Sequence, residues 1–284
     1  MVTMIDGKAV AKRMRGEIAE GVARIKAKKG ITPKLVVVLV GEDPASIIYV
    51  RNKEKGAIEL GMSSETHRIP SSIKQDSLIE IVKELNADRS IHGILVQLPL
   101  PKGISEDAVV AAISPEKDVD GLHPMNMGKL LRGEAPLHLP CTAQGVIELL
   151  LSTGIEIKGK EAVVVGRSNI VGKPVAILLL QRHATVTICH SRTRDLGEVV
   201  RRGDIIVAAV GSPGLIHGDM IKKGAYIIDV GTNRVGEKLL GDVDFESAKE
   251  RAAFITPVPG GVGPMTITML LKNTLRAAEI LGSK

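Results

Sequence analysis

The chain is short of aromatic residues and of cysteine. Its 284 residues include no Trp, two Tyr and two Phe, so aliphatic side chains must form the core, and a Tyr in polar surroundings such as Tyr49 becomes informative. The two cysteines, Cys141 and Cys189, lack the spacing of a zinc site and do not suggest a disulfide framework. None of the seven His residues pairs with another in a metal-binding spacing. We therefore predict no metal site and a reducing, cytoplasmic setting.

Long apolar runs and clustered charge are also missing. No apolar stretch approaches the roughly 20 residues that a membrane helix needs, and no basic leader precedes an apolar run at the N-terminus. The formal net charge is +6, but the basic residues are spread along the chain without interleaved aromatics, which argues against nucleic-acid binding. A solvated Lys/Arg surface is the favoured explanation of this charge, and an anionic ligand such as a dinucleotide or a polyglutamylated cofactor would also suit it. We expect neither a membrane nor a nucleic-acid partner.

Apolar β-branched runs alternate with helical periodicity along most of the chain. This order predicts two α/β units, each with a buried parallel sheet. Between them, residues 114–141 are rich in Pro and Gly and are expected to form an irregular, functional connection. Strands are expected at 35–40, 64–69, 91–98, 162–165, 185–189, 205–210, 226–230 and 254–257. Helices are expected at 7–29, 45–60, 75–85, 105–113, 145–151, after Gly166 as far as about 181, and at 265–281.

The segment from Val163 to Pro174 has the pattern of a strand, a tight turn and the start of a helix, as in a dinucleotide-binding fold. It departs from G-x-G-x-x-G, because Ser168 replaces the middle glycine and the last is displaced to Gly172. Taken alone, an ordinary turn between strand and helix explains it about as well.

The loop after the next strand favours NADP over NAD. NAD enzymes commonly place an acid there for the ribose 2′-hydroxyl. Here the loop carries hydroxyls and guanidinium groups, including Ser191, Arg192 and Arg194, and has no acid before Asp195. Such groups suit a 2′-phosphate. The alternative is a solvated loop with arginines present by chance.

A second group of polar residues falls in the N-terminal unit. Tyr49 and Lys53 are four residues apart and share one face of an expected helix. Gln97 ends an apolar strand, where ligands bind in open α/β sheets, and Asp120 lies in the irregular connection. A surface Tyr on a lysine stem, a strand-end amide and a turn acid are the structural alternatives. Their joint presence favours a catalytic site.

Five motifs stand in one order along the chain: Tyr49-Val50-x-x-Lys53, Gly93 to Pro101, Pro115 to Gly121, Val163 to Pro174, and Pro257 to Thr266. Together they resemble the bifunctional methylenetetrahydrofolate dehydrogenase/methenyltetrahydrofolate cyclohydrolase family. The resemblance implies a homodimer whose two α/β domains flank a cleft. The N-terminal three-layer catalytic domain for tetrahydrofolate derivatives would take in residues 1–139 with 265–284, and the C-terminal Rossmann domain for NADP would take in residues 140–264. It also implies that the last helix returns to the first domain.

The resemblance carries roles onto matching positions of this chain. It implies that Tyr49, Lys53, Gln97 and Asp120 are catalytic and bind the folate. Thr232 stands where the family often has Ile, a position where a backbone contact is expected. The other implied folate contacts are Leu98, Pro99, Pro259, Gly260 and Gly263, and the implied NADP contacts are Gly166, Arg167, Ser168, Ser191 and Thr232.

The implied activity is oxidation of 5,10-methylenetetrahydrofolate to the 5,10-methenyl form with NADP, followed by hydrolysis to 10-formyltetrahydrofolate. A competing interpretation is an amino-acid or shikimate-type dehydrogenase with a similar two-domain plan. Such an enzyme would not need the proline-rich motif around Gln97 or the acidic motif from Lys117 to Gly121.

Overall fold

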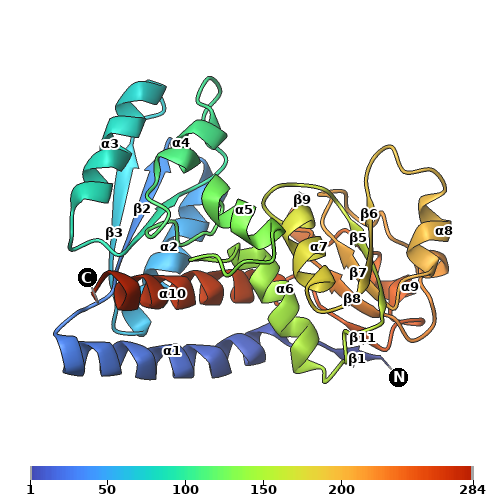
Figure 1. The fold of residues 1–284 in the computed structure, drawn as a ribbon. Helices are drawn as coiled ribbons and strands as arrows, with labels where there is room; N and C mark the ends of the chain where they lie inside the picture. The colour runs from blue at the N-terminus through green and yellow to red at the C-terminus, as the bar shows by residue number, and fades with distance from the viewer. Residues whose placement is uncertain (1, 283–284) are drawn as a thin grey trace. The chain divides into compact units, whose positions relative to one another are not determined.

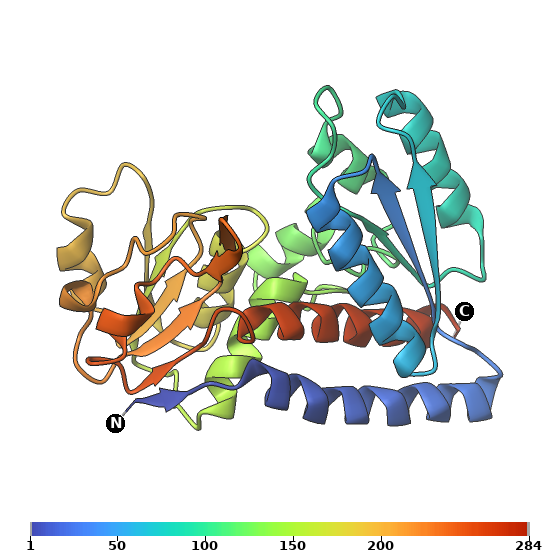
Figure 2. The ribbon, with the colours of Figure 1, turned by 180° about the vertical axis from the view of Figure 1, so that it is seen from behind.

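A computed structural model describes residues 2–282, which fall into two compact units (Figures 1 and 2). The first unit takes in the chain as far as Lys12 together with Thr142–Thr266, and the second takes in Arg13–Cys141 and the chain from Ile267 onward. Three helices contribute residues to both: α1 (Gly7–Lys29), α6 (Cys141–Ser152) and α10 (Val262–Leu281).

The unit of Arg13–Cys141 has a three-stranded parallel sheet in the order β3-β2-β4. Strand β2 is an apolar run that is buried along nearly all its length, as expected for a central parallel strand. Helices α3 and α4 pack on one face of this sheet (Figure 1), and α2 contacts β2 and β3. The bounds are β2 (Lys34–Val40), α2 (Pro44–Glu59), β3 (Ser63–Ile69), α3 (Gln75–Ala87), β4 (Gly93–Val96) and α4 (Glu106–Ala112).

The connection over residues 114–141 is less irregular than its composition predicts, because it contains helix α5 (Pro124–Leu131). Pro124 occupies the first turn, where a missing N–H costs nothing, and the Nδ1 atom of His123 accepts a hydrogen bond from the Met125 backbone N–H. A helix of eight residues is too short to give a clear periodic signal.

The unit of Thr142–Thr266 has a six-stranded parallel sheet in the order β1-β11-β8-β7-β5-β6. Strand β5 lies between β6 and β7. The next strand along the chain, β6, is therefore added on one side of β5, and β7 and β8 are added on the other side. Ligands bind at such a switch point, at the carboxyl ends of the strands. The strands are β1 (Thr3–Met4), β5 (Glu161–Val165), β6 (Thr185–Cys189), β7 (Ile205–Ala208), β8 (Tyr226–Asp229) and β11 (Phe254–Ile255).

Several short elements of this unit have no clear sequence signal. Strand β1 joins the sheet by parallel pairing of Thr3 with Phe254, so residues 2–12 group with this unit although the expected boundaries count them with the N-terminal domain. Met1, Ser283 and Lys284, which those boundaries include, lie outside the described residues. Helix α7 (Gly172–Leu180) was predicted, and the remaining elements are α8 (Leu196–Arg201), the 3-10 helix η1 (Gly218–Met220), the hairpin β9 (Asn233–Val235) and β10 (Lys238–Leu240), and α9 (Phe245–Ala248).

The predicted fold class is confirmed. Both units are α/β with parallel sheets, and the last helix belongs to the N-terminal unit from Ile267 onward. Among the helices of residues 2–282, none combines the length and the apolar character needed to cross a membrane.

Candidate active site

Lys53 and Gln97 are brought together in the N-terminal unit. Lys53 lies on α2 and is only 9% exposed, and its Nζ donates a hydrogen bond to the Oε1 atom of Gln97 at 2.8 Å. Gln97 directly follows β4, at the carboxyl end of the sheet. Tyr49 lies one helical turn before Lys53 and is 42% exposed. A buried amine held by a strand-end amide is no ordinary surface lysine, and this argues for a functional role.

The amide of Gln97 has a fixed orientation. Its Nε2 donates to the backbone carbonyl of Leu98 at 2.6 Å, so its oxygen is left to face Lys53. Leu98 is half-buried, and Pro99, joined to it by a cis peptide bond, is exposed. Both predicted substrate-binding positions thus follow directly on the amide that holds the lysine.

Asp120 reaches the same place because its segment extends the sheet. The Ile94 backbone N–H donates to the Lys117 carbonyl at 2.8 Å, and Ile94 forms a parallel bridge with Asp118. Residues 117–118 therefore run alongside β4 and in its direction. Since the carboxyl ends of parallel strands lie at one edge, Asp120 emerges beside Gln97 and interacts electrostatically with Lys53.

Burial and charge oppose each other at this lysine. Burial lowers the pKa of Lys53, and the charge of Asp120 partly restores it. Burial raises the pKa of Asp120, which Lys53 opposes. Burial also raises the pKa of the Cys141 thiol far above its ordinary value, so the thiol stays neutral. The arrangement yields an amine that loses its proton more readily than an exposed lysine, next to one carboxylate.

The other charged residues of the motif from Pro115 to Gly121 support the loop. The Nζ of Lys117 donates to the carbonyls of Leu85, Asn86 and Asp88, near the end of α3. The buried Asp118 accepts from Asn126 Nδ2 and from the backbone N–H groups of Leu122 and His123. Burial raises the pKa of Asp118 to about 7. Among the acidic residues of this motif, Asp120 is the one whose charge raises the pKa of Lys53.

The predicted dinucleotide turn after β5 is built on two glycines. A Cβ on Gly166 would lie 2.1 Å from the Ala209 carbonyl oxygen, and one on Gly172 would lie 2.2 Å from that of Gly166. Ser168 occupies the position of the middle glycine of the usual pattern, and its Oγ accepts a hydrogen bond from the Val171 backbone N–H at 3.1 Å. The departure from the usual pattern therefore places a side-chain acceptor in the loop and keeps the close packing. Ser168 and Arg167 are both exposed, available to a phosphate group.

The loop after β6 forms a turn with its basic residues outside. His190 donates its backbone N–H to Thr193 Oγ1 at 2.8 Å, and its Nδ1 accepts the Arg192 N–H at 3.1 Å. Ser191, Arg192 and Arg194 are exposed. A hydroxyl and two guanidinium groups at the end of the second strand of a dinucleotide fold fit a 2′-phosphate.

Thr232 is exposed in a loop that two buried carboxylates hold, and no sequence motif predicted either of them. Asp242 accepts from Asn233 Nδ2 and from the backbone N–H groups of Val210, Gly211 and Ser212. Asp229 accepts from the N–H groups of Gly231, Asp242 and Val243, and burial raises its pKa to about 6. Together they fix the loops at the carboxyl ends of β7 and β8. For Asp229, the sequence signal that could have indicated this role is its position as an acidic residue at the end of an apolar strand.

The last predicted loop, Pro259, Gly260 and Gly263, lies in the Thr142–Thr266 unit. Pro259 follows a cis peptide bond, Gly260 has φ +109°, and Gly263 is an exposed residue at the start of α10. The tightest packing falls on Gly261, where a Cβ would lie 2.7 Å from the Pro257 carbonyl oxygen. The loop is therefore fixed by backbone packing, with its predicted contact residues at the turn.

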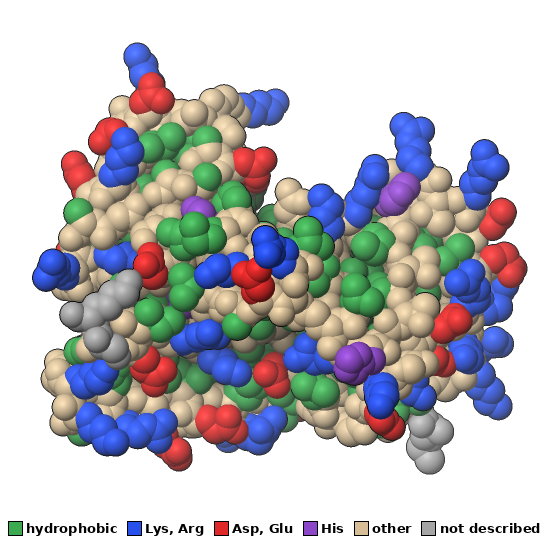
Figure 3. Space-filling model, viewed as in Figure 1, with side chains coloured by type: hydrophobic (Ala, Val, Ile, Leu, Met, Phe, Trp, Pro, Cys, Tyr) green, Lys and Arg blue, Asp and Glu red, His purple; other side chains and the backbone are tan. Residues whose placement is uncertain are grey.

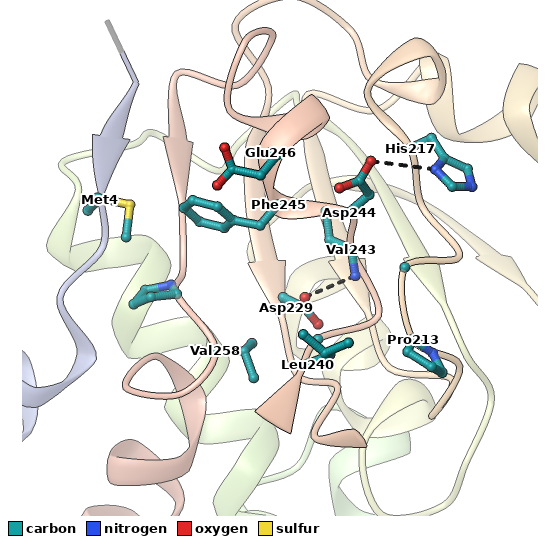
Figure 4. A pocket seen from close by; sticks show the side chains of 13 residues that line it. Met4, Pro213, His217, Asp229, Leu240, Val243, Asp244, Phe245, Glu246 and Val258 are labelled. Carbon is teal, nitrogen blue, oxygen red and sulfur yellow. Dashed lines mark hydrogen bonds and ion pairs between the residues drawn. The ribbon is translucent and has the colours of Figure 1, made fainter. Parts of the chain in front are cut away.

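A pocket of about 650 Å³ in the same unit contains none of the predicted site residues (Figure 4). His217 and Asp244 line this pocket beside Phe245 and the buried Asp229, and the His217 Nδ1 atom lies 3.8 Å from Asp244 Oδ2. Over residues 2–282 no group of three or more His, Cys, Asp or Glu side chains is placed to hold a metal ion. On the face seen in Figure 3, Lys and Arg side chains are interspersed with acidic and uncharged surface.

Comparison with known proteins assigns both parts of the chain to one family. Residues 5–120 match the tetrahydrofolate dehydrogenase/cyclohydrolase catalytic domain, and residues 140–281 match the NAD(P)-binding domain of the same name. The bifunctional protein FolD of Moorella thermoacetica is 61% identical over 97% of this chain and 98% of its own.

Solved structures agree with this assignment. The bifunctional FolD dehydrogenase/cyclohydrolase of Campylobacter jejuni has a TM-score of 0.96 and 46% identity, covering 99% of both chains. The Trypanosoma brucei enzyme, complexed with NADP and an inhibitor, has a TM-score of 0.95 and 46% identity over 98% of both.

The likeness to shikimate dehydrogenases is limited to the fold. The Thermus thermophilus enzyme has a TM-score of 0.53 at 18% identity, covering 88% of this chain and 99% of its own. The two-domain plan is therefore shared, but residues 5–120, which include Gln97 and Asp120, match the tetrahydrofolate dehydrogenase/cyclohydrolase catalytic domain. The chain belongs to the tetrahydrofolate dehydrogenase/cyclohydrolase family.

Proposed function

We propose that Lys53 is the acid–base group of the second of two reactions that this chain catalyses. The chain oxidises 5,10-methylenetetrahydrofolate with NADP and then hydrolyses the methenyl product to 10-formyltetrahydrofolate, as its family membership establishes. The observation that carries the proposal is the buried Lys53 amine, held by Gln97 at 2.8 Å and accompanied by Asp120.

The first step asks little chemistry of the protein. NADP, when bound, supplies the acceptor for the hydride that leaves the methylene carbon between N5 and N10. The nitrogen lone pairs drive this loss and leave a delocalised cation on the folate. The task of the chain is alignment. Tyr49, exposed one turn from Lys53, is placed to stack on the substrate ring and to limit the movement of the lysine side chain.

The second step needs a proton acceptor and then a proton donor. Water attacks the methenyl carbon and loses one proton to Lys53 Nζ. The bond from this carbon to N5 then breaks as Lys53 returns that proton to N5, and the remaining hydroxyl proton passes to solvent as the formyl carbonyl forms on N10. Burial already lowers the pKa of Lys53, and a cationic substrate beside it would lower the pKa further, since both disfavour the ammonium form. Gln97 keeps the amine in place through its oxygen.

Asp120 has a binding role in this proposal. The amino and lactam edge of the pterin offers two adjacent N–H donors, and one carboxylate accepts both. The position of Asp120, beside Lys53 at the edge of the sheet, suits this pairing. Leu98 and Pro99 follow Gln97 at the same edge and supply apolar contact, and Pro259, Gly260 and Gly263 supply a further part of the folate surface.

The NADP-contacting residues come from three loops of the Rossmann unit. Gly166, Arg167 and Ser168 follow β5 and meet the pyrophosphate, where Gly172 opens helix α7. Ser191, with the exposed Arg192, meets the 2′-phosphate. Thr232, in the loop after β8, contacts the nicotinamide half through its backbone. The guanidinium groups after β6 are the basis for a preference for NADP over NAD.

The chain is also proposed to act in the cytoplasm as a homodimer. The hairpin β9–β10 projects Val235, Leu239 and Leu240, each more than 40% exposed. A two-stranded hairpin is marginal alone in water, and exposed apolar side chains favour a covering partner. Light scattering on the wild type should give twice the mass of the chain, and Leu239→Glu should shift it toward one chain.

An absorbance assay with 5,10-methylenetetrahydrofolate tests the two activities together. NADP should give NADPH and a transient methenyl signal that decays to the formyl product. NAD should support a much lower rate. Reduction of NADP with shikimate in place of the folate would contradict the proposed substrate.

A further inference from the structure

Asn273 is a buried polar residue of α10, as are Thr268 and Thr274. Its side chain is 3% exposed, and its Nδ2 lies 2.8 Å from the Val119 carbonyl, 3.0 Å from the Leu139 carbonyl and 3.5 Å from Cys141 Sγ. An amide left unpaired in this buried place would destabilise the fold. The residue is kept there by the backbone groups that it binds.

Those backbone groups surround Asp120. Val119 precedes it in the chain, and the Cys141 N–H donates to the Asp120 carbonyl at 3.2 Å. A Cβ on Gly121 would lie 2.3 Å from the Leu139 carbonyl carbon, so the two chain segments are in direct contact. Asn273 therefore bridges two backbone carbonyls, one on each of the segments that fix the backbone of Asp120.

We infer that Asn273 is a positioning residue that fixes the Asp120 carboxylate beside the Lys53 amine. The inference rests on the roles proposed for Lys53 and Asp120. Because one amide donates to both segments, it fixes the position of Asp120 relative to the carboxyl end of the sheet. Without it, the Val119 and Leu139 carbonyls lose a shared donor, and the loop carrying Asp120 is free to move away from α2.

The consequence is electrostatic and can be measured. The groups facing Lys53 are Asp120 from the loop and the Cys141 thiol from α6, with the neutral Gln97 amide after β4; Asp118 interacts with Asp120 behind them. The carboxylate supports the ammonium form of Lys53. If Asp120 moves away, the pKa of Lys53 falls further, and the acid limb of the hydrolysis rate shifts to lower pH.

Two substitutions at Asn273 test the inference on the full chain. Asn273→Leu keeps the volume and removes the donor, and Asn273→Ser, a second variant in case the first fails to fold, keeps one weaker donor. We expect the KM for the folate to rise roughly tenfold to a hundredfold for Leu and less for Ser, the acid limb of cyclohydrolase kcat to shift to lower pH, and the Kd for NADP to stay unchanged.

Thr274→Val is the matched control on the same helix. Thr274 is also buried, and its Oγ1 donates only to the Leu270 carbonyl of the helix itself. Its folate KM and acid limb should match those of the wild type. A folded Asn273→Leu or Asn273→Ser with wild-type KM and acid limb would overturn the inference, provided that Lys53→Met is inactive in hydrolysis. If Lys53→Met hydrolyses normally, the proposed function itself is wrong.

Discussion

Replacing Lys53 by Met should separate the two activities. Methionine keeps the length and apolar stem of lysine but has no proton to give or accept. Lys53 Nζ donates to Gln97 Oε1 at 2.8 Å, so the variant leaves one half-buried acceptor without its donor, a cost of about 1–3 kcal/mol. A typical domain is stable by about 5–15 kcal/mol, and the variant should therefore fold.

The expected loss is confined to the proton-transfer step. A positioned acid–base group contributes about 10²–10⁴-fold, so hydrolysis of the methenyl cofactor should fall by roughly that factor. The dehydrogenase step needs alignment and no proton from Lys53, so its rate should stay within about tenfold of the wild type.

The assay follows the absorbance of the methenyl cofactor with and without enzyme, and that of NADPH in a separate reaction. Lys55→Met is the matched control, because Lys55 is an exposed lysine on the same helix whose ion pair with Glu59 spans 3.8 Å. It should leave both rates unchanged. If the Lys53→Met variant hydrolyses the methenyl cofactor at the wild-type rate, after subtraction of the uncatalysed rate, the acid–base role is refuted.

Three other predictions follow from named contacts. Asp120→Ala should weaken folate binding about a hundredfold by removing a charge-assisted pair, without changing NADP affinity, in isothermal titration; normal folate affinity would contradict its role. Asp242→Asn turns one of two doubly accepting oxygens into a donor, so NADP affinity should fall about tenfold with folate affinity intact, and equal NADP affinity would exclude a role for this carboxylate. Burial lowers the pKa of His138 from 6.5 to about 4, so its contribution to stability is full above pH 6.5 and is lost as the pH falls toward 4. The stability advantage of wild type over His138→Gln should then shrink by about 3 kcal/mol between pH 7 and 4 in urea unfolding; a constant difference would show that the imidazole titrates normally.

Much of the site follows from local pattern. The apolar runs from Leu35 and Ala162 predict buried parallel strands, and the four-residue spacing places Tyr49 and Lys53 on one helical face. The rule that ligands bind at strand ends directs attention to Gln97. Each of these signals lies within a few residues of sequence.

What the pattern could not give depends on contacts between distant segments. The bridge of Ile94 to Asp118, which brings Asp120 to the edge of the sheet, joins residues with no shared periodicity. The same holds for Asp242, which binds groups about thirty residues earlier, and for the two-residue strand β1. A polar residue among apolar ones, such as Asn273 in α10, is the signal in a sequence that indicates such a long-range contact.

Direct titration of the Lys53 amine tests the account most closely. In protein labelled with ¹⁵N at the lysine Nζ atoms, the resonance that Lys53→Met removes should titrate with a pKa below that of an ordinary lysine. Its midpoint should match the one that governs the acid limb of hydrolysis, and Asp120→Asn should move both midpoints lower together. An amine with the pKa of an ordinary lysine, or with a midpoint that differs from the kinetic one, would contradict the account.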